Sequence, residues 1–358
     1  MKIIKYNGQT LKTNHYIEME DKEYYYLKNE YFKLPIFQEV KKQILNIANG
    51  GVKDDKITNY YFLKLMVKTK LYSCKWSIED VFNSKELLSY FWVKTQLNSK
   101  VFLSKESVKR KLDTTFRLGG KGVAKKPNKF PVKKVDEILK KYNINNNYYD
   151  FSCGWGTRLT SSLKNKVNYF GTEPNYLLTE KLIQFANDYK EITKQNTIVD
   201  IRTQGSEEFI PEWENKMGVA FSSPPYYKLE DYKIGNQSYK EGVTYYQWLE
   251  NYLKPTIINI YYYLVDDGYF LLNINDFDEY KLVEDSIKIA ENNNFYLVGE
   301  EILEGNKRCK STNGFNDNSE KILVFAKTNK NNNIPHGQTS IYDYIKGSDK
   351  EWETTLKN

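Results

Sequence analysis

The stretch that decides the fold is Asp150-Phe151-Ser152-Cys153-Gly154-Trp155-Gly156-Thr157-Arg158. It overlaps the end of a short apolar segment, Tyr148 to Cys153, that we interpret as a buried strand, and it opens a helix over Thr157 to Lys166. The two glycines let the backbone turn tightly and approach a bound molecule. Such a turn is typical of an α/β protein that binds ligands beyond its strand ends, although a plain strand-helix turn uses the same two glycines.

The sequence on either side of this turn alternates regularly between strands and helices. Apolar residues at helical spacing predict a helix from Val132 to Tyr142. Further strands are expected at Asn168–Thr172, Ile198–Thr203, Met217–Ser222, Tyr269–Ile274, Phe295–Ile302 and Lys321–Ala326, and helices at Tyr176–Tyr189, Thr244–Leu264 (kinked or split at Pro255) and Phe277–Asn292. Because no helix separates the last two strands, we predict a mostly parallel sheet with helices on both faces and a C-terminal antiparallel pair.

The composition excludes several classes of protein. The chain has 358 residues and 40% hydrophobic residues, enough for one large α/β domain and a smaller one. It has no run of eighteen apolar residues and no signal-peptide core, so neither a membrane span nor secretion is expected. The cysteines Cys74, Cys153 and Cys309 show no paired or metal-like spacing, which favours a reducing cytoplasm. With only His15 and His336, a histidine-centred hydrolase or a zinc site is not expected, and we predict no metal.

Positive charge is concentrated in one segment of the chain. The formal net charge is +7, while Lys100 to Lys141 holds fourteen Lys or Arg and four Asp or Glu, a local balance of 14 − 4 = +10. The remainder of the chain therefore sums to 7 − 10 = −3. A segment of this density favours a polyanion as partner, with a solvated surface of a lysine-rich protein as the alternative.

The second expected strand ends in an acidic residue. Glu173 follows Gly154 by about twenty residues, a separation at which a carboxylate can accept hydrogen bonds from both hydroxyls of a ribose. Dinucleotide-binding folds share this arrangement, so Glu173 alone does not distinguish the cofactor. The Gly-x-Gly-x-x-Gly pattern of dinucleotide sites is absent, because position 159 is Leu.

The fourth strand is followed by Ser222-Ser223-Pro224-Pro225-Tyr226-Tyr227. Two successive prolines stiffen this loop and remove two backbone donors, which leaves Ser223 and the Pro224 carbonyl as hydrogen-bond acceptors. Acceptors placed on an amino group can turn its lone pair toward a methyl donor. Tyr226 provides a flat face on which a base can stack.

In this order, on neighbouring strand ends, the two motifs resemble those of the S-adenosylmethionine-dependent DNA amino-methyltransferases, which methylate N4 of cytosine or N6 of adenine. The resemblance covers about residues 115 to 330, and the Ser-Pro-Pro-Tyr form points to cytosine N4. It implies a Rossmann-like class I methyltransferase fold with a seven-stranded sheet, and S-adenosylmethionine as cofactor. It implies transfer to an extruded base by Ser223, Pro224, Pro225 and Tyr226. The implied cofactor residues are Phe130, Asp150, Ser152, Gly154, Gly156, Glu173, Ser206, Glu207 and Ser222.

The chain departs from the pattern of this family at two of these positions. Ser206 stands where the family commonly has Asp against the adenine amino group, and Glu207 is the alternative for that role. Ser152 stands where the family usually has Phe, and Phe151 is the neighbour that can fill that space. From the residues alone, Phe130 serves equally well as a hydrophobic staple for the helix that follows it. None of the cysteines follows a proline, which disfavours cytosine C5 methylation.

Target recognition is assigned to the part of the chain that the resemblance leaves out. We expect an accessory domain, mainly helical, at 1–115, a methyltransferase domain at 116–330 and a tail at 331–358. Phosphate contacts are expected from Lys105, Lys109, Arg110, Lys111, Arg117 and Lys121; the loop Tyr227–Thr244 and the segment Glu304–Ser319 are other candidates for recognition. DNA adenine-N6 methylation, RNA or protein-amide methylation and a non-catalytic DNA-binding subunit remain alternative functions. A restriction endonuclease would be a separate chain.

Overall fold

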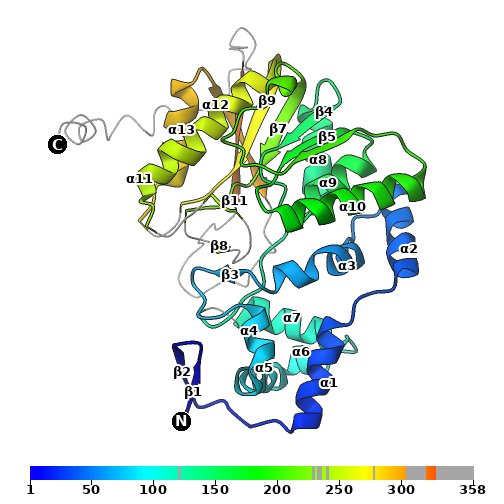
Figure 1. Cartoon of the computed structure of the whole chain (residues 1–358), viewed down its shortest axis with the longest axis vertical. Coiled ribbons are helices and arrows are strands. Elements are labelled where there is room, and N and C mark those ends of the chain that lie inside the picture. Colours follow the sequence, from blue (N-terminus) through cyan, green and yellow to red (C-terminus); the bar gives the residue numbers. More distant parts are fainter. Residues whose placement is uncertain are drawn as a thin grey trace, which may run out of the picture.

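A seven-stranded sheet forms the centre of the protein (Figure 1), in the order β10-β11-β9-β7-β4-β5-β6. Its strands are β4 (Asn147–Asp150), β5 (Asn168–Thr172), β6 (Val199–Arg202), β7 (Met217–Ser222), β9 (Leu264–Asn273), β10 (Tyr296–Leu303) and β11 (Glu320–Ala326). Five neighbouring strands, β6, β5, β4, β7 and β9, run parallel to one another. β11 runs antiparallel to both β9 and β10. This strand order and the antiparallel end confirm the expected Rossmann-like methyltransferase fold.

The computed structural model describes residues 1–119, 122–227, 230–231, 236–238, 242–276, 279–303 and 320–327. Several residues of the sequence predictions lie outside these ranges. They are Lys121 of the expected phosphate contacts, much of the loop Tyr227–Thr244, the segment Glu304–Ser319 and the tail 331–358.

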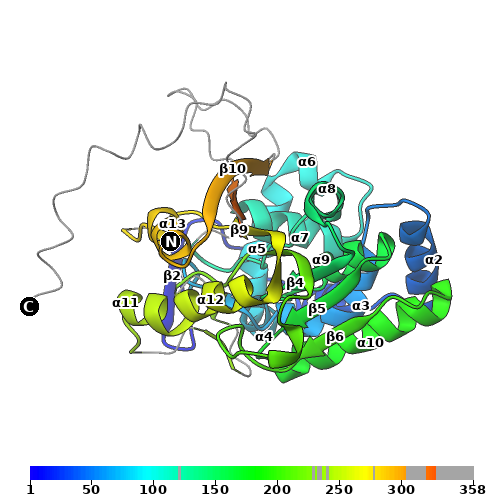
Figure 2. The same cartoon turned by 90° about the horizontal axis from the view of Figure 1, so that it is seen from above.

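Helices cover both faces of the sheet (Figure 2). One face carries α8 (Val132–Tyr142), α9 (Thr157–Lys164) and α10 (Tyr176–Thr193), and the other carries α11 (Tyr245–Trp248), α12 (Lys254–Tyr263) and α13 (Leu282–Asn292). A separate hydrophobic core lies on each face. Because β7 lies near the middle and is covered on both faces, all six of its residues are buried, as its continuous apolar run predicts. Within the described residues, no helix is long and apolar enough to cross a membrane.

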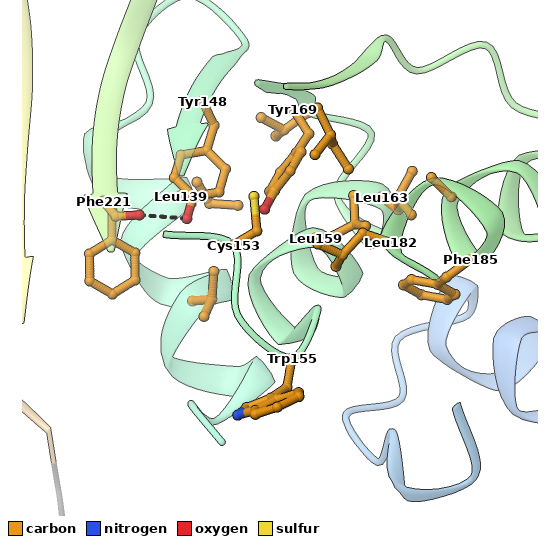
Figure 3. Packing of buried hydrophobic residues seen from close by; sticks show 14 of the residues in the cluster. Leu139, Tyr148, Cys153, Trp155, Leu159, Leu163, Tyr169, Leu182, Phe185 and Phe221 are labelled. Carbon is orange, nitrogen blue, oxygen red and sulfur yellow. Dashed lines mark hydrogen bonds between the residues drawn. The ribbon is translucent and has the colours of Figure 1, made fainter. Parts of the chain in front are cut away.

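Tyrosines with satisfied hydroxyls contribute heavily to these cores. Figure 3 shows Cys153 between the rings of Tyr148 and Tyr169, with Leu182 and Phe185 of α10 farther along the same cluster. The Tyr148 hydroxyl donates to the carbonyl of Phe221 at 2.7 Å, which ties β4 to β7. A buried tyrosine is tolerated where its hydroxyl finds such a partner. The tyrosine-rich composition therefore reaches into the sheet core and is not confined to the surface.

Pro255 interrupts the long helix, as expected, and does so through a π-helical turn. The turn, η2 (Leu249–Leu253), joins α11 to α12, which carries Pro255 in its first turn. Proline has no N–H for the carbonyl of Asn251, so the α-helical ladder is broken one turn before it. Such π turns are frequent at functional sites. Its residues Asn251 and Tyr252 lie beside the carboxyl edge of the sheet.

The first 119 residues are mainly helical, as expected, but they begin with an unexpected hairpin. The elements are β1 (Lys2–Tyr6), β2 (Gln9–Thr13), α1 (Asp21–Phe32), α2 (Phe37–Ala48), α3 (Asp55–Met66), β3 (Lys70–Leu71), α4 (Ile78–Asn83), α5 (Lys85–Leu97), α6 (Ser99–Phe102) and α7 (Val108–Gly119). Asn7 and Gly8 take positive φ values at the hairpin turn, which is the Asn-Gly signal for this turn. Most of these elements surround a third core of their own.

α2 and one side of α3 pack elsewhere, while Leu63 of α3 lies in the third core. α2 and α3 pack against α10 in the first core, where Ile44, Tyr61 and Phe62 join Phe185 and Tyr189. The Tyr61 hydroxyl also donates to Asp188 of α10 at 2.6 Å. In addition, β3 pairs with β8 (Glu230–Asp231), which follows the Ser-Pro-Pro-Tyr motif. A domain boundary near residue 115 stays a prediction, and the hydrophobic core crosses it.

Candidate active site at the carboxyl edge of the sheet

A cavity of about 570 Å³ lies beyond the carboxyl ends of the parallel strands. Residues from all five parallel strand ends line it, among them Ser152 after β4, Glu173 after β5, Ser206 after β6, Ser223 after β7 and Asn273 at the end of β9. In the sheet, β4 lies between β5 and β7. The chain continues from β4 to β5 and β6 on one side and then crosses to β7 on the other, so the cavity lies where the strand order reverses. Ligands of open α/β sheets bind at this position.

Glu173 holds a nearly buried carboxylate against the cavity. Its two oxygens accept from the backbone N–H of Gly154 at 3.2 Å and of Asn175 at 3.1 Å. Burial raises the pKa of Glu173 to about 7, although these two hydrogen bonds act in the opposite direction. The carboxylate therefore lies beside the glycine turn, and ribose binding by Glu173 stays a prediction.

Asp150 is fully buried and does not line the cavity. Its carboxylate accepts two hydrogen bonds from Nε of Arg158, at 3.0 and 2.9 Å, and a third from the Tyr169 hydroxyl at 2.7 Å. The Arg158 guanidinium also donates to the carbonyl of Ser152. Within the described residues, Asp150 thus fixes the shape of the glycine turn from behind. A direct contact between Asp150 and the cofactor stays a prediction.

The two glycines of the turn have different surroundings. Gly154 lines the cavity with φ +54°, and a Cβ atom there would find ordinary contacts only. Gly156 does not line the cavity; it has φ +72°, and a Cβ atom would lie 2.9 Å from Phe62 of α3 and 3.2 Å from Leu182 of α10. Gly154 therefore adjoins the ligand space, while Gly156 permits close packing of the N-terminal helices.

The remaining expected cofactor residues lie on the cavity wall, with one exception. Phe130, Ser152, Ser206 and Glu207 line the cavity. Phe130 packs edge-on against Phe221, with ring centroids 5.2 Å apart. The Ser206 hydroxyl is hydrogen-bonded to Thr256 at 2.8 Å. Ser222 is fully buried outside the lining and donates to the Ser152 carbonyl at 3.2 Å.

All four residues of the Ser-Pro-Pro-Tyr motif line the same cavity. The Ser223 hydroxyl accepts from the amide of Asn273 on β9 at 3.2 Å. Tyr226 is partly buried and packs on the second core, while Tyr227 beside it is 2% exposed and donates to the Val243 carbonyl at 2.7 Å. The buried Tyr227 thus anchors the loop that presents Tyr226 to the cavity.

Several lining residues were missed by sequence reasoning. Trp248, Asn251 and Tyr252 reach the cavity from α11 and η2, and the Tyr252 hydroxyl lies 3.3 Å from that of Ser152. Burial raises the pKa of Tyr252. The expected break at Pro255 was the available signal for this wall, because a broken helix next to a strand end commonly borders a site. Asn273 could have been noticed as a polar residue near the end of the expected strand Tyr269–Ile274; the structure ends this strand at Asn273.

Among the described residues, the cysteine on the cavity wall is Cys153, and its thiol is not activated. Burial raises the pKa of the Cys153 thiol well above its ordinary value, and nearby Asp150 and Glu173 add to the effect. A neutral, buried thiol is a poor nucleophile. Among the described residues, no group of three or more His, Cys, Asp or Glu side chains is arranged to hold a metal ion.

Three of the expected phosphate contacts are exposed on the surface. Lys105, Arg110 and Arg117 are accessible to solvent, and Arg110 forms an ion pair with Glu106 at 2.9 Å within the same segment. Exposed pairs of this kind contribute little to stability and leave the guanidinium available. These side chains remain suitable for contacts with a polyanion.

The other two described lysines of this set are held by the protein. The Lys109 ammonium lies 4.1 Å from the ring centroid of Tyr31 and 3.3 Å from its carbonyl, and burial lowers the pKa of Lys109 to about 8. Lys111 donates to the Phe102 carbonyl at 2.8 Å. A phosphate contact by Lys109 would require its side chain to leave Tyr31, so its assignment stays a prediction that these contacts do not favour.

Comparisons with known proteins find only distant likenesses, all of them to solved structures. No protein-family model matches the chain, and no curated protein matches its sequence. Among solved structures, it is similar to a TehB-like S-adenosylmethionine-dependent methyltransferase from Corynebacterium glutamicum, with 13% identity and a TM-score of 0.37 over 54% of this chain and 86% of the other. It is also similar to magnesium protoporphyrin IX methyltransferase from Synechocystis, with 12% identity and a TM-score of 0.36 over 69% and 94% of the two chains. These likenesses concern the fold alone.

Proposed function

We propose that this protein transfers a methyl group from S-adenosylmethionine to the exocyclic N4 amino group of cytosine in DNA, after the base has been extruded from the duplex. The observation that carries the proposal is one cavity shared by two motifs. The glycine turn with Glu173 forms one part of the wall, and Ser223 to Tyr226 forms another.

The first part of the wall suits the methyl donor. Glu173 offers carboxylate oxygens to the two hydroxyls of a ribose, while Gly154 leaves its face of the cavity free of a side chain. The cavity volume lies within the range of small-molecule sites, roughly 300–1,000 Å³. When bound, S-adenosylmethionine supplies a methyl group whose bond to sulfur breaks as the nitrogen–carbon bond forms, with one amino proton released.

The second part of the wall suits the acceptor. Ser223 and the Pro224 carbonyl accept hydrogen bonds from the amino group and orient its lone pair, which is conjugated with the base in the ground state. Tyr226 stacks on the base, and its position is fixed by the anchored Tyr227. No covalent intermediate is required, in agreement with the neutral Cys153 thiol.

DNA as the polymer is supported by the exposed cations Lys105, Arg110 and Arg117 and by the size of the N-terminal part, which we propose contributes to target recognition. Adenine N6 is the second candidate, because the same acceptors serve either amino group. The Ser-Pro-Pro-Tyr form favours cytosine.

The decisive experiment is incubation of the whole chain with methyl-labelled S-adenosylmethionine and, in parallel, duplex DNA, RNA and protein. Mass spectrometry of the digested nucleosides should find N4-methylcytosine in the DNA. If N6-methyladenine is found instead, the target base is adenine and not cytosine. Label only in RNA or protein, or no label at all, would contradict DNA methylation.

A further inference from the structure

Asn273 is a buried polar residue whose hydrogen bonds are half satisfied. It ends β9, is 3% exposed and lines the cavity. Its amide nitrogen donates to the Ser223 hydroxyl at 3.2 Å, while its amide oxygen is buried and has no hydrogen-bond partner among the described residues. Buried acceptors are nearly always satisfied in folded proteins, so an orphan on the wall of a cavity indicates a donor that arrives with a ligand.

The sheet fixes the position of Asn273 next to Ser223. β7 and β9 pair in parallel, with Ser222 opposite Leu272, so the following residues, Ser223 and Asn273, leave the sheet side by side. The next polar side chains along this strand end serve other purposes. Asn275 accepts from the backbone of Lys321 at 3.5 Å, and Asp276 accepts from that of Val283 at 2.9 Å. Only Asn273 of these three lines the cavity.

We propose that Asn273 is a positioning residue for the amino group that is methylated. Its N–H₂ group holds the Ser223 hydroxyl in place and occupies one of the two lone pairs of that oxygen, which leaves the other lone pair for the substrate. Its carbonyl oxygen takes a hydrogen bond from an N–H donor of the bound ligand. This inference rests on the proposed function: the amino group of the base has two N–H donors, one for Ser223 and one that the carbonyl oxygens of Pro224 and Asn273 share.

A second donor of the same chemistry is the ammonium group of the methionine part of the cofactor. The two sources predict different kinetics. If the donor is the base, loss of Asn273 lowers kcat and leaves cofactor affinity unchanged. If the donor is the cofactor, loss of Asn273 weakens cofactor binding in the absence of DNA.

The test is a double-mutant cycle with Asn273→Ala, Ser223→Ala and the combined variant, in the whole chain and on the DNA that the wild type methylates. We expect Asn273→Ala to lower kcat about tenfold or more, by the loss of an aligned hydrogen bond, and to change the dissociation constant of the cofactor less than about twofold. Because Asn273 acts in part through Ser223, Asn273→Ala should lower kcat by a smaller factor when Ser223 is already Ala than in the wild type. Asn275→Ala, on the same strand end but outside the cavity, is the matched control and should retain full activity.

Asn273→Asp provides a variant of nearly equal size if the alanine variant does not fold. A charged carboxylate cannot donate to Ser223, whereas a protonated one can. The kcat of Asn273→Asp should therefore rise as the pH falls, relative to the wild type, and a purely structural role would not produce this profile. Additive effects in the cycle, or a pH profile equal to that of the wild type, would overturn the proposal. An inactive wild type would contradict the proposed function itself.

Discussion

At the scale of single residues, the cofactor half of the site depends on the buried carboxylate of Glu173. We expect Glu173→Ala to weaken S-adenosylmethionine binding by about 1.5–3 kcal/mol, the range for hydrogen bonds to a charged group. Isothermal titration calorimetry without DNA checks this. Asp200→Ala is a suitable control. Asp200 and its partner Arg202 both belong to β6, the strand next to β5, and Asp200 does not line the cavity. Unchanged affinity in the Glu173 variant would remove the ribose assignment.

The raised pKa of Glu173 also predicts how pH affects binding. In the empty site the carboxyl is protonated below about pH 7. Ribose hydroxyls donate to the charged form, so cofactor affinity should rise between about pH 6 and pH 8, and this dependence should disappear in Glu173→Gln. Rising pH has the opposite effect on folding stability. The pKa of Glu173 is higher in the folded protein than in the unfolded chain, so the unfolding free energy decreases as the pH rises from the ordinary pKa of 4.5 to about 7. Calorimetry across this range measures the first effect.

Tyr226 allows a test of base stacking that is independent of the cofactor. Tyr226→Ala removes a stacking platform worth roughly 1–3 kcal/mol, while Tyr226→Phe retains the ring. We therefore expect the alanine variant to lose methyl transfer and the phenylalanine variant to keep most of it, with cofactor affinity nearly unchanged in both. Equal turnover of the two variants would exclude the stacking role.

At the scale of elements, the turn between β4 and α9 joins the N-terminal helices to the sheet through Gly156. An alanine there has both an unfavourable positive φ and a 2.9 Å approach to Phe62. Gly122→Ala is a matched control, because Gly122 has φ +77° and open space around its Cβ position. Gly156→Ala should therefore lose about 1–3 kcal/mol more than the control, the usual cost of overpacking. Urea denaturation of both variants gives the difference.

The elements also show what the sequence could and could not predict. The strands that end at Ser222 and Thr172 were predictable because each is a short apolar run bounded by turn residues. The hairpin Lys2–Thr13 was not expected, although Asn7-Gly8 carries its signal, because its strands have little apolar alternation. Trp248 and Tyr252 line the cavity because one side of an interrupted helix faces the strand ends. The spacing of apolar residues in the sequence does not show which side that is.

At the scale of the whole molecule, the basic segment divides into exposed and buried cations, which the sequence did not distinguish. Lys109 is buried against Tyr31, which lies far away in the chain, so its burial had no local signal in the sequence. Charge reversal of Lys105, Arg110 and Arg117 should weaken DNA binding equally for all sequences and reduce the slope of log affinity against log salt by about 0.9 per lost phosphate contact. Fluorescence anisotropy at several salt concentrations measures this slope. An unchanged slope would assign these residues to a solvated surface.

The packing of α2 and α3 against α10 has a consequence for synthesis of the chain. The apolar faces of Ile44 and Phe62 are made before the residues that cover them, Phe185 and Tyr189, which follow about 120 to 145 residues later. At translation rates of roughly 5–20 residues per second, these faces stay uncovered for on the order of 6–29 s. During that interval the ribosome-bound chain exposes the type of surface that chaperones recognise. These two helices are therefore covered only after α10 has emerged, and their core is complete only when β11, which contributes Ile322 and Val324, has been made.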